Sequence, residues 1–473
     1  MRILAIDQGT TSTRAILFSQ TGDARHIGSR SHRNEYPRHG WVEQDANELA
    51  VNIMSLIEAA GPVDAIGLAN QGESCLAWDS VTKEPLSPII VWQDTRTVQI
   101  LERMAAEGLE KTVRRRAALP LDPYFSAAKL GWIVANLPKA AAALKAGRLR
   151  LGTTDAFFLD RLADCFATDR ATASRTSLMN METGEWDEEL CRLFGVPLEC
   201  LPPIRSNIAG FGSIAGARVG ASIVDQQAAL YGHGCRIAGD AKVTFGTGAF
   251  ALTVTGTSLK RDALESGLLP TVAWDLGDET TYAIDGGVQD AGSAIEWALR
   301  AGMARSLLDF EILEPTTAVE RGLVFIPAFS GLGCPTWDRS ASPLIIGLQP
   351  SMDRRDICQA LLEGVAFLTS QVLAAIGNHC ALQEHIPIDG GIAANSYFVQ
   401  FLANCSGRSF RVGSFAEQTA AGVASLAALA LGEEIDPPRL QQFLVGPSLD
   451  GAVWSGIFND AICRARGWRP APL

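Results

Sequence analysis

Hydrophobic and polar residues alternate in short blocks from the start of the chain. Mostly apolar residues fill 2–6, polar residues fill 7–12, and a second apolar run covers 15–18. This pattern predicts a strand, a tight polar turn and a return strand. The turn offers a glycine, hydroxyl groups and backbone N–H groups that can converge on a phosphate. Asp7 places a carboxylate beside them, where a hydrated Mg²⁺ could bridge it to the phosphates.

The second half of the chain repeats this order of elements. A strand is predicted at 242–245, a Gly/Thr turn at 246–248 and a return strand at 249–254. A third turn, Gly390-Gly391, ends a buried strand and opens a helix, and its glycines let backbone approach a ring or a ribose closely. We therefore expect two halves on one plan, with domains at 1–237 and 238–473. The three turns are consistent with an adenine-nucleotide site divided between them.

Other patterned segments indicate an α/β protein. Short buried strands at 65–69 and 88–92 each end in polar residues, at the strand ends where α/β folds place ligands. Helices are predicted at 101–116, at 126–146 with a break at Pro138, at 356–376 and at 417–431. The alanines and the glycine of the last helix leave room for close packing against another helix.

Composition narrows the class of protein. The 473 residues suit two or three domains, and 47% hydrophobic with 19% charged residues is ordinary for a folded soluble chain. The net charge of −12 argues against binding to nucleic acid or an anionic membrane surface. Ten scattered cysteines without a C-x-x-C pair favour reduced thiols in the cytoplasm. No signal peptide or membrane span is expected, and a homodimer is kept as a possible assembly.

Familiar phosphate-binding motifs are missing from the sequence. There is no G-x-x-x-x-G-K-[ST] and no G-x-G-x-x-G that opens a helix, so phosphates must be held by the hairpin turns. Asp225 is a candidate general base for an acceptor hydroxyl, and its alternative role is a helix N-cap. Glu73, Trp92 and Tyr124 supply the mixture of carboxylate and aromatic faces that a polyol needs. Each could equally be a buried structural residue.

Taken together, the motifs resemble the FGGY carbohydrate kinases, and among them the glycerol kinases most closely. The resemblance runs in order along almost the whole chain. It is carried by A-I-D-Q-G-T-T-S-T-R-A (5–15), G-W-V-E-Q-D (40–45), V-W-Q-D-T-R (91–96), D-P-Y-F-S (122–126), A-S-R-T (173–176), D-Q-Q-A-A-L (225–230), F-G-T-G (245–248), P-A-F-S-G-L-G-C-P-T-W-D (327–338) and D-G-G (389–391). It implies a two-domain fold of the actin/hexokinase/Hsp70, ribonuclease H-like type, with the active site in the cleft.

The resemblance also implies roles for single residues. The phosphates of ATP would be bound by the first phosphate turn (Thr10, Thr11, Ser12 and Arg14) and by the second phosphate turn (Thr247). The rest of the nucleotide would be bound by the nucleotide segment (Gly292 and Glu296) and by the adenosine segment (Gly391 and Asn395). Mg²⁺ would be held by Asp7 and Asp225. The acceptor would be bound by Glu73, Trp92, Tyr124, Asp225, Gln226 and Phe250. Glycerol kinases usually carry Gln at the position of Glu296.

One departure from the family bears on the acceptor. Glycerol kinases read N-Q-R-E where this chain reads Asn70-Gln71-Gly72-Glu73. The expected reaction is ATP-dependent phosphorylation of a primary hydroxyl, by default glycerol to glycerol 3-phosphate. Because Gly72 removes an arginine, the alternative acceptor is a four- or five-carbon polyol or a ketose. A non-catalytic nucleotide-binding interaction protein and an ATP hydrolase are the alternatives from other classes.

Overall fold

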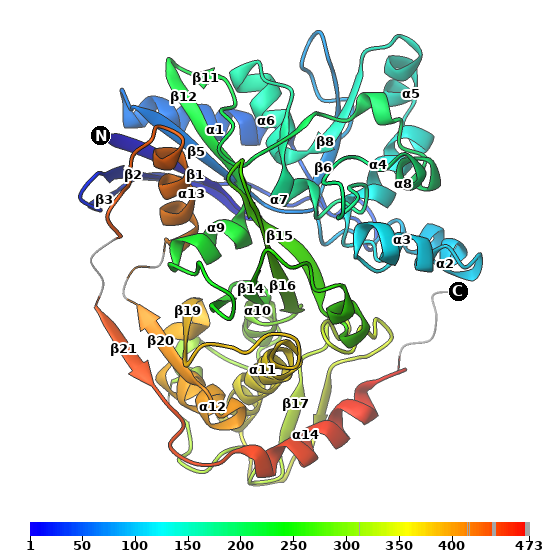
Figure 1. Ribbon diagram of the computed structural model, residues 1–473. Coiled ribbons are helices and arrows are strands. Elements are labelled where there is room, and N and C mark those ends of the chain that lie inside the picture. Colours follow the sequence, from blue (N-terminus) through cyan, green and yellow to red (C-terminus); the bar gives the residue numbers. More distant parts are fainter. Residues whose placement is uncertain (312, 414, 416, 438–440, 469–473) are drawn as a thin grey trace.

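Two large sheets form the centres of two lobes (Figure 1), and the fold is α/β as expected. The computed structural model describes residues 1–311, 313–413, 415, 417–437 and 441–468. The first sheet has six strands in the order β11-β12-β5-β1-β2-β3. Their bounds are β11 Ser213–Ile214, β12 Ala217–Val224, β5 Ala65–Asn70, β1 Arg2–Gln8, β2 Ser12–Ser19 and β3 Ala24–Ser31.

The second sheet has seven strands in the order β15-β16-β14-β13-β19-β20-β21. Their bounds are β15 Leu269–Asp275, β16 Thr280–Val288, β14 Ala249–Gly256, β13 Ala241–Phe245, β19 His385–Gly390, β20 Ser409–Gly413 and β21 Gln442–Val445. In each sheet a hairpin (β1-β2 or β13-β14) has an antiparallel neighbour on one side and two parallel strands on the other. The prediction of two halves on one plan is confirmed.

Strand register brings distant loops to one edge of each sheet. Gln8 pairs with Asn70, and Asn70 pairs with Val224, across three parallel strands. The segments that follow these residues therefore leave the first sheet side by side. In the second sheet Phe245 pairs with Gly390, so the turns after them also leave together. The two edges supply the walls of the site described below.

Other strands of the described residues form smaller sheets. One four-stranded sheet has the order β4-β7-β6-β8, and β9-β10 and β17-β18 form two-stranded pairs. Their bounds are β4 Glu43–Gln44, β7 Ile89–Ile90, β6 Cys75–Asp79, β8 Leu149–Thr153, β9 Thr168–Asp169, β10 Ile204–Arg205, β17 Val324–Ile326 and β18 Leu344–Ile346. The strand predicted at 88–92 is thus shorter than expected.

The helices follow the predicted segments with local corrections. They are α1 Ala46–Ala60, α2 Val98–Ala106, α3 Glu110–Ala117, α4 Ser126–Asn136, α5 Pro138–Lys145, α6 Thr154–Ala163, α7 Arg170–Ala173, α8 Glu188–Phe194, α9 Asp225–Gly232, α10 Gly292–Arg300, α11 Arg354–Gly377, α12 Ser396–Ser406, α13 Gln418–Leu429 and α14 Ala452–Ala465. The single helix predicted at 101–116 is wrong, because Gly108 at φ +75° separates two helices. The break at Pro138 is confirmed, since Pro138 begins α5.

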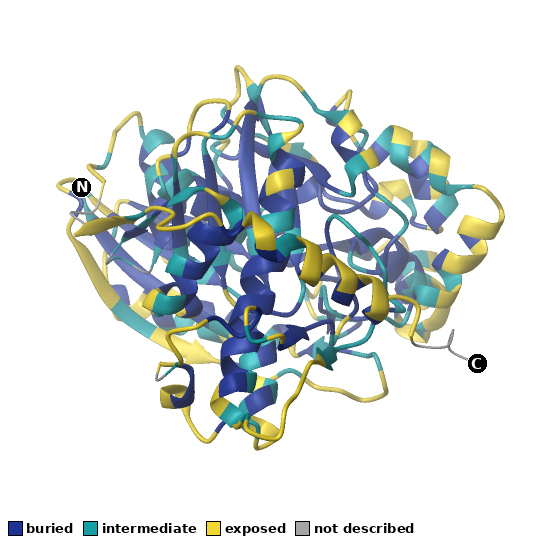
Figure 2. Cartoon of the chain, turned by 90° about the horizontal axis from the view of Figure 1, so that it is seen from below, coloured by how far each residue is buried: buried dark blue, intermediate teal, exposed yellow. Residues whose placement is uncertain are grey.

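Among the described residues, four short 3₁₀ helices lie between these elements: η1 Leu198–Cys200, η2 Arg261–Ser266, η3 Leu307–Phe310 and η4 Gly391–Ala394. The helix expected after Gly391 therefore starts as η4 and continues as α12. Buried residues gather in the middle of the molecule and exposed ones on its outer loops and helices (Figure 2). One helix in the described part of the chain, α11, is long and apolar enough to cross a membrane by length and composition. Because 78% of its apolar window is buried inside the molecule, it is a core helix here.

Helix α13 comes from the second half of the chain but packs against the first sheet, beside β1 and β5 (Figure 1). It also crosses α9 at very short range. A Cβ on Gly422 would lie 1.8 Å from the carbonyl oxygen of Ala228, and one on Gly232 would lie 2.0 Å from that of Gln418. The close packing predicted from the small residues of this helix is confirmed. The domain boundary at 237/238 stays a prediction.

Candidate active site

A cavity of about 240 Å³ lies where the edges of the two sheets face each other. The predicted site residues that line it are Asp7, Thr10, Thr11, Ser12, Arg14, Glu73, Trp92, Tyr124, Asp225, Gln226, Thr247 and Phe250. The fold therefore brings together residues from both halves of the sequence.

The first phosphate turn is shorter than predicted and firmly held. Asp7 and Gln8 belong to β1, and only residues 9–11 form the turn, closed by a 3.0 Å hydrogen bond from Gly9 N to Ser12 O. Trp92 Nε1 donates to Thr10 Oγ1 at 3.0 Å, and Gln44 Nε2 donates to the Thr10 carbonyl at 2.7 Å. These bonds fix the turn without using the hydroxyls of Thr11 and Ser12.

The second phosphate turn is joined to the start of α10. The backbone N–H groups of Ala291 and Ser293 each donate to the Thr247 carbonyl at 3.0 Å, and that of Gly292 donates to Gly246 at 3.0 Å. A Cβ on Gly292 would lie 2.5 Å from the Gly246 carbonyl oxygen. Glycine at 292 is therefore required for this contact, and the predicted second phosphate turn is joined directly to the predicted nucleotide segment.

A second cavity of about 750 Å³ adjoins the first, and Gly246 lines both. The remaining predicted residues, Gly292, Glu296, Gly391 and Asn395, line it. Asn395 is the N-cap of α12: its Oδ1 accepts from Phe398 N at 2.9 Å, and its Nδ2 donates to the Phe310 carbonyl at 2.8 Å. The cavity size lies within the usual range for small-ligand sites.

Aromatic rings form one wall of the smaller cavity. The ring of Trp92 meets Tyr124 edge-on with centroids 5.6 Å apart and meets Phe250 at 6.2 Å. Such edge-to-face packing holds each ring in place. The rings offer apolar surface to the carbon atoms of a small ligand.

Asp225 lies in an environment suited to proton transfer. It is the first residue of α9, and its Oδ1 accepts from the backbone N–H of Gln226 at 2.7 Å. Burial, with the charges of Asp7 and Glu73, raises its pKa to about 7. A base with a pKa near the working pH is the most effective one. The N-cap alternative is wrong, because Val224 occupies that position and no side chain caps the helix.

Asp7 and Asp225 also fit a divalent cation. Both line the smaller cavity, and burial raises the pKa of Asp7 to about 6 although Arg14 opposes the shift. These are two partly buried carboxylates, neither of which forms a salt bridge with a described residue, and they offer hard oxygen ligands of the kind Mg²⁺ prefers. The described residues hold no cluster of three or more His, Cys, Asp or Glu side chains that could bind a metal, so water and phosphate oxygens would complete the shell.

Two charged residues of the cavity were not singled out from the sequence. Arg175 follows α7, and Asp285 lies in β16. Arg175 is part of the A-S-R-T motif, which could have pointed to it, whereas Asp285 stands in a strand with no motif around it. Glu73, which contacts Arg175, has φ +57°, a left-handed conformation that is uncommon outside glycine and frequent in active sites.

The fold and the cavity define a two-domain kinase of the actin/hexokinase/Hsp70 type. The N-terminal domain of the FGGY family of carbohydrate kinases matches residues 2–225, and the C-terminal domain of that family matches residues 241–431. The chain belongs to the FGGY family of carbohydrate kinases, and the resemblance noted in the sequence is confirmed.

Relatives agree with this assignment. The chain is 38% identical to a glycerol kinase of Alkalilimnicola ehrlichii and 38% identical to one of Deinococcus radiodurans, with 98% of each chain covered in both cases. A crystal structure of Plasmodium falciparum glycerol kinase with ADP matches with a TM-score of 0.86 at 27% identity, covering 98% of both chains. A ligand-bound xylulose kinase from Lactobacillus acidophilus matches at 0.85 and 20% identity, covering 98% of this chain and 97% of that one, which shows the shared fold.

Proposed function

We propose that this carbohydrate kinase transfers the γ-phosphoryl group of ATP to a primary hydroxyl of glycerol, giving glycerol 3-phosphate and ADP. The single observation that carries the proposal is the position of Asp225. It lies in one small cavity with both glycine-threonine turns and with the aromatic wall, and its pKa is about 7. The relatives named glycerol kinases at 38% identity support glycerol as the acceptor.

The residues divide into three groups in this proposal. Asp225 accepts the proton of the primary hydroxyl, and that oxygen attacks the γ-phosphorus in line as the bond to the ADP oxygen breaks. Thr10, Thr11, Ser12, Arg14 and Thr247 bind the phosphates, and Gly292, Glu296, Gly391 and Asn395 bind the adenosine. Glu73, Trp92, Tyr124, Gln226 and Phe250 orient the acceptor. Mg²⁺, held through Asp7 and Asp225, would neutralise phosphate charge when bound.

Arg14 is already partly engaged, because its Nη1 lies 3.3 Å from Oε2 of Glu417 at the start of α13. An exposed pair of this kind is weak. A triphosphate with its larger charge can therefore replace Glu417 as the partner of Arg14.

The proposal is tested by acceptor-dependent ADP release. Purified protein with ATP and Mg²⁺ is given glycerol, four- and five-carbon polyols and ketoses in turn, and kcat/KM ranks them. Glycerol is expected to rank first. A four- or five-carbon polyol or ketose ranking first would favour the alternative suggested by Gly72, which the named relatives do not favour. ADP release independent of any acceptor would indicate a hydrolase, and ATP binding without release a non-catalytic protein.

Location and assembly complete the proposal. The cysteines of the described residues are all free, which supports the reducing environment of the cytoplasm. The two-domain division at 237/238 and a homodimer remain predictions. Limited proteolysis and size-exclusion chromatography with light scattering test them.

A further inference from the structure

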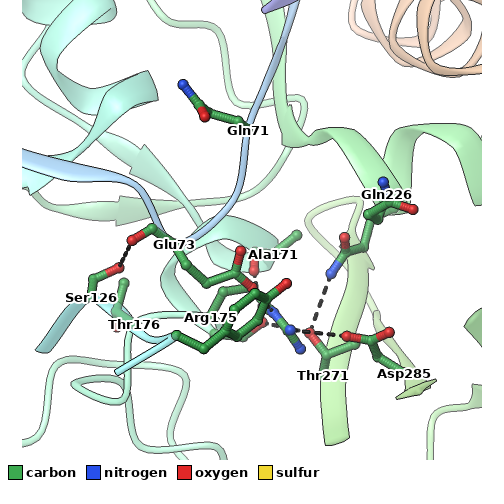
Figure 3. Close-up of polar contacts among 12 residues, drawn as sticks. Gln71, Glu73, Ser126, Ala171, Arg175, Thr176, Gln226, Thr271 and Asp285 are labelled. Atoms are coloured by element: carbon green, nitrogen blue, oxygen red, sulfur yellow. Dashed lines mark hydrogen bonds and ion pairs between the residues drawn. The ribbon is translucent and has the colours of Figure 1, made fainter. Parts of the chain in front are cut away.

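The guanidinium of Arg175 lies between the carboxylates of Glu73 and Asp285 (Figure 3), and all three residues line the smaller cavity. Its Nε donates to Oε1 of Glu73 at 2.6 Å, and its Nη2 donates to Oδ2 of Asp285 at 2.9 Å. All three side chains are less than one-tenth exposed. Burial lowers the pKa of Arg175, but the two carboxylates outweigh it, so the pKa is raised and the side chain stays charged.

Two polar atoms in this cluster are left without a partner. Nη1 of Arg175 and Oδ1 of Asp285 are buried and have no hydrogen-bond partner among the described residues. A buried donor or acceptor that stays unpaired costs about 1–3 kcal/mol, and more for a charged group. Their residues line the smaller cavity, and unpaired atoms beside a cavity are candidates for contacts that a ligand completes.

The donor and the acceptor match one kind of ligand group. A hydroxyl can accept a hydrogen bond from Nη1 and donate one to Oδ1 at the same time. A carboxylate or phosphate could accept from Arg175 but would meet the charges of Glu73 and Asp285. The charges of the cluster therefore favour a neutral hydroxyl over an anionic group.

The cluster also lies beside the one departure from the family. Gly72 directly precedes Glu73 and lines the same cavity. Glycine at 72 has no side chain to hold an acceptor hydroxyl. Arg175, whose Cζ is 5.8 Å from the ring centroid of Tyr124, brings a guanidinium to this part of the pocket from a different loop.

We propose that Arg175 and Asp285 bind an acceptor hydroxyl that does not react, in the part of the pocket where the resembling kinases carry an arginine in place of Gly72. This inference rests on the proposed glycerol kinase activity. It makes Arg175 and Asp285 specificity-determining residues for polyols that carry a hydroxyl next to, or one carbon beyond, the reacting end.

The test combines enzyme variants with acceptors that lack single hydroxyls. Arg175→Lys keeps the charge but loses the fork that includes Nη1, and Asp285→Asn keeps the shape but not the charge. Each is assayed with glycerol, 1,2-propanediol and 1,3-propanediol, and a diol that is turned over too slowly is measured as a competitive inhibitor. KM for ATP and thermal stability are recorded alongside.

If Arg175 and Asp285 contact the acceptor hydroxyl directly, the effect of each substitution and the effect of removing that hydroxyl should not add. Each variant is expected to lose about 10- to 100-fold in kcat/KM for glycerol, the range of a hydrogen bond to a charged group, but less than about 3-fold for the diol that lacks the contacted hydroxyl. KM for ATP is expected to stay within about 2-fold of wild type. An equal loss with all three acceptors, or no loss with glycerol, would overturn the inference.

A control and a separate outcome keep the two proposals apart. Arg170→Lys changes an arginine of α7 that pairs with Asp275 outside the cavity, and it is expected to leave acceptor selectivity unchanged. If Arg175→Lys does not fold, Asp285→Asn decides. Wild-type protein without glycerol-dependent ADP release would contradict the proposed function itself, whereas equal losses across acceptors contradict only the role of Arg175 and Asp285.

Discussion

Gly72 and Val224 are packed so closely that a Cβ on Gly72 would lie 2.8 Å from Cγ2 of Val224. The contact follows from strand register, since Asn70 pairs with Val224 and the loop after β5 passes over the end of β12. Val224 directly precedes Asp225. The residue at 72 and the proposed base are therefore coupled through one valine methyl group.

Gly72→Ala is expected to lower kcat/KM because the added methyl group pushes Val224, and with it Asp225, out of place. Overpacking of this kind costs about 1–3 kcal/mol. The double variant Gly72→Ala/Val224→Ala is expected to recover most of the activity. Gly72→Arg is likewise expected to need Val224→Ala for activity. Acceptor kinetics of the single and double variants provide the check. Full activity of Gly72→Ala alone would show that the loop yields without cost.

Asp225→Asn is expected to lower turnover by at least about 100-fold, because an amide cannot take the acceptor proton. ATP binding, measured by calorimetry, is expected to be retained. Asp278→Asn is the matched control, since Asp278 is exposed and lies outside both cavities. Near-normal turnover in Asp225→Asn would remove Asp225 from the mechanism.

The same variant is expected to be more stable than wild type. The pKa of Asp225 is raised to about 7 in the folded protein from an ordinary 3.8, so the folded state holds a proton that the unfolded state has lost between these values. Wild-type stability therefore falls as pH rises from about 4 to 7. The thermal midpoint of Asp225→Asn should exceed that of wild type most above pH 7, and the difference should shrink toward pH 4. Each kcal/mol of added stability corresponds to a rise of roughly 2–4 °C in the midpoint. A gain that does not depend on pH would refute this cause.

The acceptor kcat/KM should increase with pH through about 7, as Asp225 loses its proton. Because the charge of Asp7 helps to raise the pKa of Asp225, Asp7→Asn is expected to move this increase in kcat/KM to lower pH. Steady-state rates between pH 5 and pH 9 test both statements. An unchanged pH dependence of kcat/KM in Asp7→Asn would mean that the carboxylates of Asp7 and Asp225 do not interact.

Gly422→Ala is expected to weaken both stability and activity, because its Cβ would meet the carbonyl oxygen of Ala228 at 1.8 Å and force α13 away from α9. Helix α9 begins with Asp225, so the base would move too. Gly456→Ala is the control: Gly456 lies in α14 with open space around its Cβ position, and alanine there should stabilise by about 0.5–1 kcal/mol. Thermal unfolding and turnover are measured for both. Unchanged values for Gly422→Ala would show that the helices can separate freely.

Sequence reasoning anticipated the local parts of this fold well. The two hairpins, the glycine turn after β19, the break at Pro138 and the small-residue face of α13 are each dictated by residues next to one another in the chain. The predicted ends of strands and helices were less accurate. Asp7 and Gln8 extend β1 because they pair with Arg14 and Thr13 across the hairpin, and Gly108 divides a segment whose apolar spacing alone suggested one helix.

The sequence by itself determined the family and proposed the phosphate turns and Asp225 as site residues, because those features rest on short motifs whose chemistry is local. Only the tertiary structure decided which side chains lie beside Gly72 in the proposed acceptor pocket. Arg175 meets Glu73 and Asp285 across separations of 102 and 110 residues, and no periodicity or motif encodes such a contact. It arises because the loop after β5 of the first sheet and strand β16 of the second sheet meet at one cavity, where a buried charge is stable only with a partner.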